Sequence, residues 1–241
     1  MNENEVIIIG HRGASNIAPE NTLKSFQKAI ELGADYIEFD LHKSKDGAIV
    51  IMHDSNTFTT TGHKGSIKRM TLKELKKLNC GEGEQIPTLR ETIELTKCKI
   101  GLQIEIKAKG MAEQLVSILR EEDMIDSTIV SSFQHAELLK IKKIESTLKI
   151  ATLEPIITDW SKDWSYLGGI INNAIRHNSY AIHPMYHLVN KKFIDFAHQN
   201  DLKINIWTVN SKAAMKKFIK MGIDGLITDD ILKAKEVLEQ I

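Results

Sequence analysis

Three acidic residues stand at positions from which their carboxylates would converge. Glu38 and Asp40 lie two residues apart in Tyr36–Leu41, where they alternate with apolar residues, and Glu105 alternates with isoleucines in Gln103–Lys107. Alternation with a period of two is typical of a β-strand and places each set on one face. Three carboxylates that share one site repel one another, so at least one of them would take up a proton unless a cation were bound.

A divalent cation would remove this conflict between the negative charges. Ligation by carboxylate oxygens alone suits a hard ion, either Ca2+ or Mg2+ with Mn2+ as a further candidate, better than it suits Zn2+. We therefore predict one divalent hard cation bound by Glu38, Asp40 and Glu105. The alternative is a cluster without an ion, in which Lys107 and Arg12 neutralise the carboxylates.

Two histidines are expected beside these carboxylates. His11 and Arg12 directly follow the first apolar run, and His53 ends another. If Asp46-Gly47 forms a two-residue hairpin turn, Asp40 and His53 face each other across the hairpin. Imidazole exchanges protons near neutral pH, so one histidine could activate a nucleophile while the other protonates a leaving alcohol. With cations beside them, the pattern indicates chemistry on an anionic phosphodiester.

Short β-branched runs alternate with amphipathic helical patterns along the chain, which indicates repeated strand–helix units. The predicted strands are Val6–Gly10, Tyr36–Leu41, Ile100–Lys107, Thr128–Ser132, Lys149–Leu153, Tyr180–His183, Lys203–Val209 and Gly225–Thr228. The predicted helices are Thr22–Leu32, Leu89–Thr96, Met111–Glu122, Ala136–Ile144, Asp163–Leu167, Asn190–Gln199, Lys212–Met221 and Ile231–Gln240. Eight such units predict an α/β fold, a closed (β/α)8 TIM barrel, with a doubly wound open sheet as the alternative.

One of these units is longer than the others. About 45 residues separate the strand that ends at Leu41 from the helix that begins at Leu89, too many for a plain loop. Ile49–His53 is predicted to return along the strand as a hairpin, and residues 55–86, with a short helix at Leu72–Leu78, to form an inserted cap subdomain. The domain prediction is a single barrel over residues 1–241 with this cap at its mouth.

The strand patterns also predict which side chains fill the barrel. Isoleucines such as Ile104 and Ile106 should pack outward under the helices. The polar members should point inward near the carboxyl-terminal rim, where barrel enzymes carry their chemistry. These inward residues are Glu38, Asp40, Glu105, Lys107, Asn205 and Trp207. A solvent-facing alternation would suit an exposed antiparallel sheet, but parallel barrel strands are covered on both faces.

Composition narrows the classes of partner. The 241 residues include 42% hydrophobic residues and 32 basic against 32 acidic ones, so the formal charge is zero. A nucleic-acid binder would usually show a basic excess, and none is expected as a partner. The apolar run Val6–Ile9 is too short for a signal peptide or a membrane span, so we expect a cytoplasmic protein with no stable membrane anchor. Cys80 and Cys98 are expected to be reduced thiols.

Several stretches, in order along almost the whole chain, carry a resemblance to a known family. They are His11-Arg12-Gly13-Ala14, Pro19-Glu20-Asn21-Thr22, Glu38-Phe39-Asp40, Lys45-Asp46-Gly47, His53-Asp54, Ile86-Pro87-Thr88-Leu89, Glu105-Ile106-Lys107, Trp207-Thr208-Val209-Asn210 and Gly225-Leu226-Ile227-Thr228-Asp229. In these the chain resembles the glycerophosphodiester phosphodiesterases of the cytosolic bacterial type. The resemblance implies a barrel with an inserted cap that hydrolyses small-molecule glycerophosphodiesters to sn-glycerol 3-phosphate and an alcohol.

The resemblance also implies a role for each matching residue. The implied roles are a general acid–base pair (His11 and His53), metal ligands (Glu38, Asp40 and Glu105) and substrate-binding residues (Arg12, Lys107, Trp207 and Glu20). For Glu20 the alternative is helix-start chemistry, because an acid before a capping Asn21 or Thr22 favours the helix dipole. Where many relatives carry an arginine before paired threonines, this chain has Phe58-Thr59-Thr60-Thr61, so the cap contact of that arginine is not expected.

Two rival functions fit parts of the pattern. A lysophospholipase D-like or phosphoinositide phospholipase C-like enzyme would share the barrel, the histidines and the metal, but it would need an apolar rim or an amphipathic anchor. A non-enzymatic binding barrel should have lost a ligand or a histidine, and here the set is complete. Trp160, Trp164 and Tyr166 could rim the site for a bulkier leaving group, although packing of a short helix is favoured.

Overall fold

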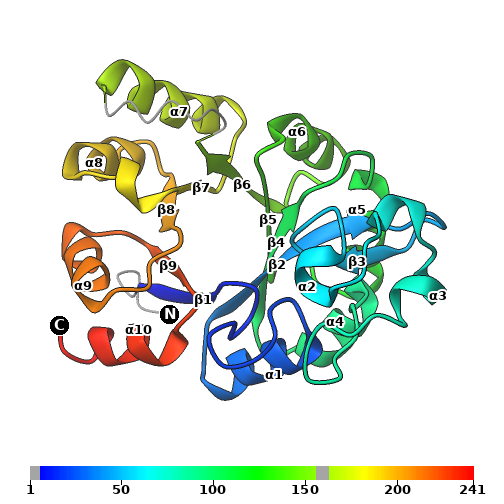
Figure 1. Ribbon diagram of the computed structural model, residues 1–241. Helices are drawn as coiled ribbons and strands as arrows, with labels where there is room; N and C mark the ends of the chain where they lie inside the picture. Colours follow the sequence, from blue (N-terminus) through cyan, green and yellow to red (C-terminus); the bar gives the residue numbers. More distant parts are fainter. Residues whose placement is uncertain (1–5, 156–162) are drawn as a thin grey trace.

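The computed structural model describes residues 6–155 and 163–241. Within them, eight parallel strands form a closed ring, because β1 pairs with both β2 and β9 (Figure 1). The ring strands are β1 (Ile7–Gly10), β2 (Tyr36–Lys43), β4 (Gly101–Ile106), β5 (Thr128–Ser132), β6 (Lys149–Glu154), β7 (Ala181–Pro184), β8 (Lys203–Ile206) and β9 (Gly225–Thr228). The TIM-barrel prediction is confirmed, and the open sheet is excluded by the pairing of the first strand with the last.

Eight helices surround this ring of strands in the described part of the chain (Figure 1). They are α1 (Leu23–Glu31), α4 (Leu89–Thr96), α5 (Ala112–Glu121), α6 (His135–Ile144), α7 (Trp164–Arg176), α8 (Lys191–His198), α9 (Lys212–Met221) and α10 (Ile231–Leu238). Side-chain caps define where several of them begin. Thr22 accepts a hydrogen bond from the backbone of Ser25 at α1, and Thr88 with Glu91 forms a capping box at α4.

The main apolar core lies between the strands and the helices. Ile37, Phe39 and Leu41 of β2 are fully buried in it, together with Ile104 and Ile106 of β4. Because alternate residues of a strand point to opposite faces, Glu38, Asp40 and Glu105 are turned to the inside of the ring. The predicted direction of both sets is confirmed for these two strands.

The hairpin after β2 differs from the prediction by one residue. β3 (Ile49–Ile51) pairs antiparallel with β2, with Leu41 opposite Ile51 and Lys43 opposite Ile49. The pairing closes on a three-residue loop, residues 45–47, rather than on the predicted two-residue turn. Every strand residue therefore lies one position away from its predicted partner.

The conformation of the loop explains this error in register. A two-residue type I′ turn needs the left-handed conformation at both central positions, but Gly47 adopts it (φ 85°) and Asp46 does not. As a result, Asp40 does not face His53 across the ladder, and its carbonyl oxygen accepts a hydrogen bond from the backbone N–H of Met52. The argument that placed His53 opposite Asp40 was wrong.

The segment between β3 and α4 has a small apolar cluster of its own. It contains α2 (Phe58–Thr61), the 3-10 helix η1 (Ile67–Arg69) and α3 (Leu72–Leu75). The cluster is built from Val50, Met52, Ile67, Leu75, Cys80 and Ile86.

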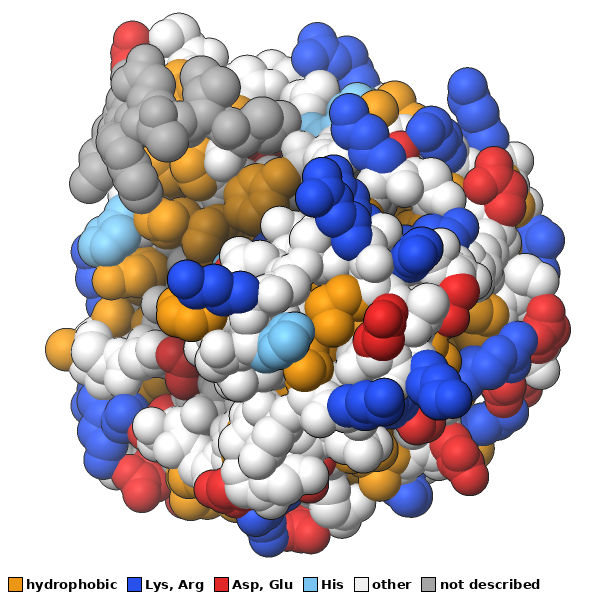
Figure 2. Space-filling view, turned by 45° about the vertical axis from the view of Figure 1, so that its right-hand side comes forward, with side chains coloured by type: hydrophobic (Ala, Val, Ile, Leu, Met, Phe, Trp, Pro, Cys, Tyr) orange, Lys and Arg blue, Asp and Glu red, His pale blue; other side chains and the backbone are white. Residues whose placement is uncertain are grey.

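In Figure 2 basic and acidic side chains are interspersed over the face turned forward, in keeping with the zero net charge.

Helix α7 is longer than the sequence predicted. The predicted helix Asp163–Leu167 stopped before Gly168 and Gly169, but the helix continues to Arg176. α7 buries one face, which includes Leu167, Ile171 and Ala174, so tertiary packing offsets the low helix propensity of glycine. Trp164 packs edge-on against Phe196 of α8, which fits the packing interpretation of this residue, whereas Trp160 lies outside the described residues.

Candidate active site

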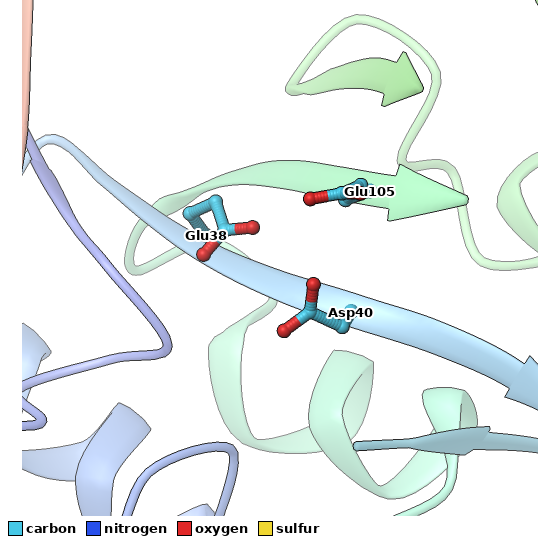
Figure 3. Close-up of side chains that lie close together, drawn as sticks. All are labelled: Glu38, Asp40 and Glu105. Carbon is cyan, nitrogen blue, oxygen red and sulfur yellow. The ribbon is translucent and has the colours of Figure 1, made fainter. Parts of the chain in front are cut away.

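The three predicted carboxylates meet inside the barrel. Each of Glu38, Asp40 and Glu105 offers an oxygen within 4.8 Å of those of the other two, and all three side chains are buried. Figure 3 shows Glu38 and Asp40 on β2 and Glu105 on the neighbouring β4, with their carboxyl groups turned toward a common space. Asp40 and Glu105 are paired in the parallel ladder between β2 and β4, which brings the carboxylates of the two strands side by side.

Two cations and one backbone N–H contact this carboxylate cluster. The Lys107 Nζ lies 2.7 Å from Glu105 Oε1 and 3.2 Å from Asp40 Oδ1. The Arg12 Nε lies 3.8 Å from Asp40 Oδ2, and the Arg12 backbone N–H donates to Glu38 Oε2 at 3.0 Å. These contacts are also those expected of the salt-bridged alternative, so the charge balance decides between the two interpretations.

The carboxyl groups differ in their affinity for protons. Burial, followed by the charge of Asp40, raises the pKa of Glu38 to about 7 and the pKa of Glu105 to about 8. Burial also opposes ionisation of Asp40, but Lys107 and then His53 outweigh it and hold the pKa of Asp40 below its usual range. Lys107 and Arg12 therefore do not balance the charge of all three carboxyl groups, and Glu38 and Glu105 tend to keep a proton instead. A set of carboxylate oxygens of this kind fits a hard divalent cation.

Divalent-ion binding should strengthen as the pH rises, because the ion must displace protons from Glu38 and Glu105. Their raised pKa values stabilise the ion-free fold at low pH, and this contribution is lost as the pH rises through about 7 to 8. The melting temperature in EDTA should fall over this range, and the increase caused by Mg2+ should grow. Thermal unfolding with EDTA or Mg2+ between about pH 5.5 and about pH 9 measures both.

Glu105→Gln provides the control, since it removes one titrating group and should weaken the dependence on pH. An increase in melting temperature that stays constant over the whole range would contradict the expectation.

His11 lies at the end of β1 and is held by a carboxylate from the other end of the chain. Its Nδ1 lies 2.6 Å from Oδ1 of Asp229, the residue that directly follows β9. Ser15 and Asn210 donate further hydrogen bonds to Asp229, which keeps that carboxylate in place. Burial alone would lower the pKa of His11, but the hydrogen bond to Asp229 and the charge of Glu38 raise it above its usual value. The protonated form of His11 is therefore favoured.

His53 follows β3 two residues after its end, and its place in the site stays a prediction because the register that predicted it was wrong. A positive charge on the imidazole would contribute, after that of Lys107, to the lowered pKa of Asp40. Its Nδ1 lies 2.9 Å from Asp54 Oδ1, and its side chain is 36% exposed. The Nε2 of His42 lies 3.1 Å from the His53 carbonyl oxygen, so a neighbour on β2 fixes the backbone here. His53 is thus held by two neighbours and remains partly open to solvent.

Glu20 contacts Arg12 rather than the start of α1. The Arg12 Nη1 lies 2.9 Å from both Glu20 carboxylate oxygens, while the side chain of Thr22 provides the helix cap. Glu20 therefore orients a predicted phosphate-binding cation, and any direct contact with substrate stays a prediction.

An aromatic pair stands at the ends of β5 and β8. Trp207 meets Phe133 edge-on, with ring centroids 5.8 Å apart. The Trp207 indole N–H donates to the His183 carbonyl oxygen at 2.8 Å, which fixes the plane of the ring. His183 itself is fully buried, and burial lowers its pKa to about 3, so it is neutral. Its Nε2 pairs with Asn205, which identifies it as an interior packing residue.

Sequence reasoning missed several residues that hold the site together. Asp229, Asn21 and His42 each contact a predicted site residue. Asp229 had a usable signal, because it directly follows a predicted strand at the carboxyl-terminal rim, where barrel side chains converge. His42 continues the inward row of β2 two residues after Asp40.

Comparison with known proteins identifies the family. The model of the glycerophosphoryl diester phosphodiesterase family matches residues 11–233. The chain belongs to this family. A glycerophosphodiester phosphodiesterase of Caldanaerobacter subterraneus subsp. tengcongensis is 37% identical over 241 residues, which cover 94% of this chain and 95% of that protein.

Solved structures of the family superimpose on almost the whole chain. The glycerophosphodiester phosphodiesterase of Thermotoga maritima shares 29% identity with a TM-score of 0.80, over 95% of this chain and 97% of that one. An Oleispira antarctica phosphodiesterase, solved with the product sn-glycerol-3-phosphate, shares 26% identity with a TM-score of 0.85, over 97% and 96%. The predicted family and enzyme class, a phosphoric diester hydrolase of the glycerophosphodiester type, are confirmed.

The length and hydropathy of the helices bear on the prediction that no segment spans a membrane. Among residues 6–155 and 163–241, none of the helices combines the length and the apolar character needed to cross a bilayer.

Proposed function

We propose that the protein hydrolyses small glycerophosphodiesters to sn-glycerol 3-phosphate and an alcohol, with one divalent hard cation bound by Glu38, Asp40 and Glu105. The observation that carries the proposal is the buried cluster of three carboxylates whose oxygens lie within 4.8 Å of one another. The Oleispira phosphodiesterase with its bound product, a structure of the same fold, supports the glycerol phosphate as the conserved half of the substrate.

The cation is Ca2+ or Mg2+, with Mn2+ as a further candidate, because all three proposed ligands are carboxylates. When bound, it offsets charge on the phosphoryl oxygens. Arg12 and Lys107 place two positively charged side chains beside the carboxylates, and both lie close to Asp40. They bind the phosphate, and Glu20 orients the guanidinium of Arg12.

The two histidines transfer the protons. In each of them a carboxylate engages Nδ1, Asp229 for His11 and Asp54 for His53, so Nε2 is left as the ring nitrogen for the substrate. His11, whose pKa is raised, donates a proton from Nε2 to the oxygen of the leaving alcohol. His53 accepts the proton of the attacking nucleophile, which is water or the glycerol 2-hydroxyl, as the bond between phosphorus and the alcohol oxygen breaks. Where the 2-hydroxyl attacks, water then opens the cyclic phosphate to give sn-glycerol 3-phosphate. A carboxylate on Nδ1 orients the ring and stabilises its charged form during transfer.

The aromatic pair Trp207 and Phe133 provides an apolar wall for the glycerol, while the alcohol points toward the open mouth and the cap of residues 55–86. Several head groups should therefore be hydrolysed with kcat/KM values within about tenfold of one another. Trp207→Ala should raise KM for all of them alike. Glycerophosphocholine, glycerophosphoethanolamine and glycerophosphoglycerol, assayed by release of glycerol phosphate, measure this.

Trp207→Phe is the matched control, because it keeps an aromatic ring but loses the hydrogen bond to His183. Selectivity for one head group that survives in Trp207→Ala would contradict this arrangement. Turnover of lysophosphatidylcholine in preference to the soluble diesters would favour the rival lysophospholipase function instead, and the same panel repeated in EDTA tests the cation.

A further inference from the structure

The loop between β1 and α1 holds two of the proposed metal ligands through uncharged donors. The Arg12 backbone N–H donates to Glu38 Oε2 at 3.0 Å, and the Asn21 Nδ2 donates to Asp40 Oδ2 at 2.9 Å. The two ends of the loop are themselves joined, because the Asn21 backbone N–H donates to the Arg12 carbonyl oxygen. Both ligands of β2 are thus oriented by one closed segment of backbone.

Asn21 meets a combination of demands that few residues satisfy. Its backbone is left-handed (φ 57°), a conformation open to Gly, Asn and Asp but costly for other residues. Glycine would lack the donor, and aspartate would bring a fourth carboxylate against Asp40. The amide orientation is fixed for the same reason, because the reverse orientation would set Asn21 Oδ1 against the Asp40 oxygen.

The bond to Asn21 acts on Asp40 differently from the bonds to the cations. Lys107 and Arg12 compete with a bound cation for the charge of Asp40, and Lys107 is shared with Glu105. The amide of Asn21 restrains rotation of the carboxylate without cancelling its charge. Asn21 is 4% exposed and Asp40 is 1% exposed, so water cannot replace this hydrogen bond.

We propose that Asn21 is a positioning residue for the divalent cation, which it serves by fixing the carboxylate of Asp40 in the orientation that binds the ion. The inference rests on the proposed metal site and adds a residue that does not itself bind the ion. Residues that orient metal ligands typically contribute about 10- to 100-fold in metal affinity.

Asn21→Gly tests this proposal, because glycine keeps the left-handed backbone and deletes only the amide. The dissociation constant for Mg2+, measured by calorimetry on the ion-free protein, should rise by about 10- to 100-fold. Activity should then need more Mg2+ while kcat at saturating Mg2+ changes far less. Asn178→Gly is the matched control, since Asn178 is also left-handed (φ 51°) but exposed after α7, and its Mg2+ affinity should equal that of the parent.

A merely structural role would lower the melting temperature of Asn21→Gly equally with and without Mg2+. An Asn21→Gly variant with the parental dissociation constant would overturn the proposal, while a parent that binds no divalent ion would overturn the proposed metal site itself. Should the glycine variant be unfolded in plain buffer, variant and parent are both measured in a stabilising osmolyte such as sucrose, where the same change in affinity is expected.

Discussion

Asp40→Asn should lower kcat by about 10³-fold or more at any concentration of Mg2+. The substitution keeps the size of the side chain and removes the charge that Lys107 and Arg12 hold in place. A bound cation stabilises transition-state charge by several kcal/mol, and each ~1.4 kcal/mol is a factor of ten in rate. Asp40 has the largest share in this because it is the carboxylate whose pKa is lowered, and so the one that is already ionised at neutral pH.

The measurement is turnover of a glycerophosphodiester by parent and variant over a range of Mg2+ concentrations, with the melting temperature as a check on folding. Mg2+ should raise the melting temperature of the parent and leave that of the variant unchanged. Glu113→Gln, which removes an exposed carboxylate in the first turn of α5, is the control and should behave like the parent. Activity that resists EDTA, together with a mildly affected Asp40→Asn, would favour the salt-bridged cluster without an ion.

His11→Ala and His53→Ala should each reduce kcat by about 10²- to 10⁴-fold, the usual contribution of general acid–base catalysis. KM should change much less, because the proposed phosphate contacts of Arg12 remain. Both side chains are partly open to solvent, 21% for His11 and 36% for His53, so folding should be preserved. Steady-state kinetics on one substrate give both quantities. His63→Ala, at an exposed histidine between β3 and α4, should leave kcat unchanged.

The pH profile separates the roles of the two histidines. Asp229→Asn removes the carboxylate that raises the pKa of His11, so His11 should lose its proton at a lower pH. If His11 is the general acid, the decline in activity on the alkaline side moves to lower pH in this variant. An unchanged alkaline limb, or near-parental turnover by either alanine variant, would show that the role assigned to that histidine is wrong.

The positions of the three carboxylates were predictable because a strand has only two faces. Once Ile37, Phe39 and Leu41 are assigned to the side covered by helices, the residues that alternate with them must face the inside of the barrel. These are Glu38 and Asp40. The hairpin register was not predictable in the same way. It depends on the backbone conformation of Asp46, and Asp-Gly occurs in both two- and three-residue loops.

The contacts that hold the site residues in place could not be predicted, for a different reason. Asn21 and Asp40 lie 19 positions apart in different elements, and their hydrogen bond depends on how the β1–α1 loop folds over β2. The extent of α7 was missed because glycine is a poor helix former, and the burial of one face of the helix in the folded protein offsets this. Local pattern predicts which face a residue occupies, whereas the partner it meets there depends on the tertiary structure.

The bond between His11 and Asp229 has a consequence for the order in which the molecule becomes active. It joins residues 218 positions apart, one at the end of β1 and the other just beyond β9, the two strands whose pairing closes the ring. During synthesis His11 leaves the ribosome 218 residues before Asp229. A nascent chain that has already gathered Glu38, Asp40 and Glu105 still has an imidazole without its carboxylate. The contacts of the site are therefore complete only when the final strand–helix unit has been made and docked.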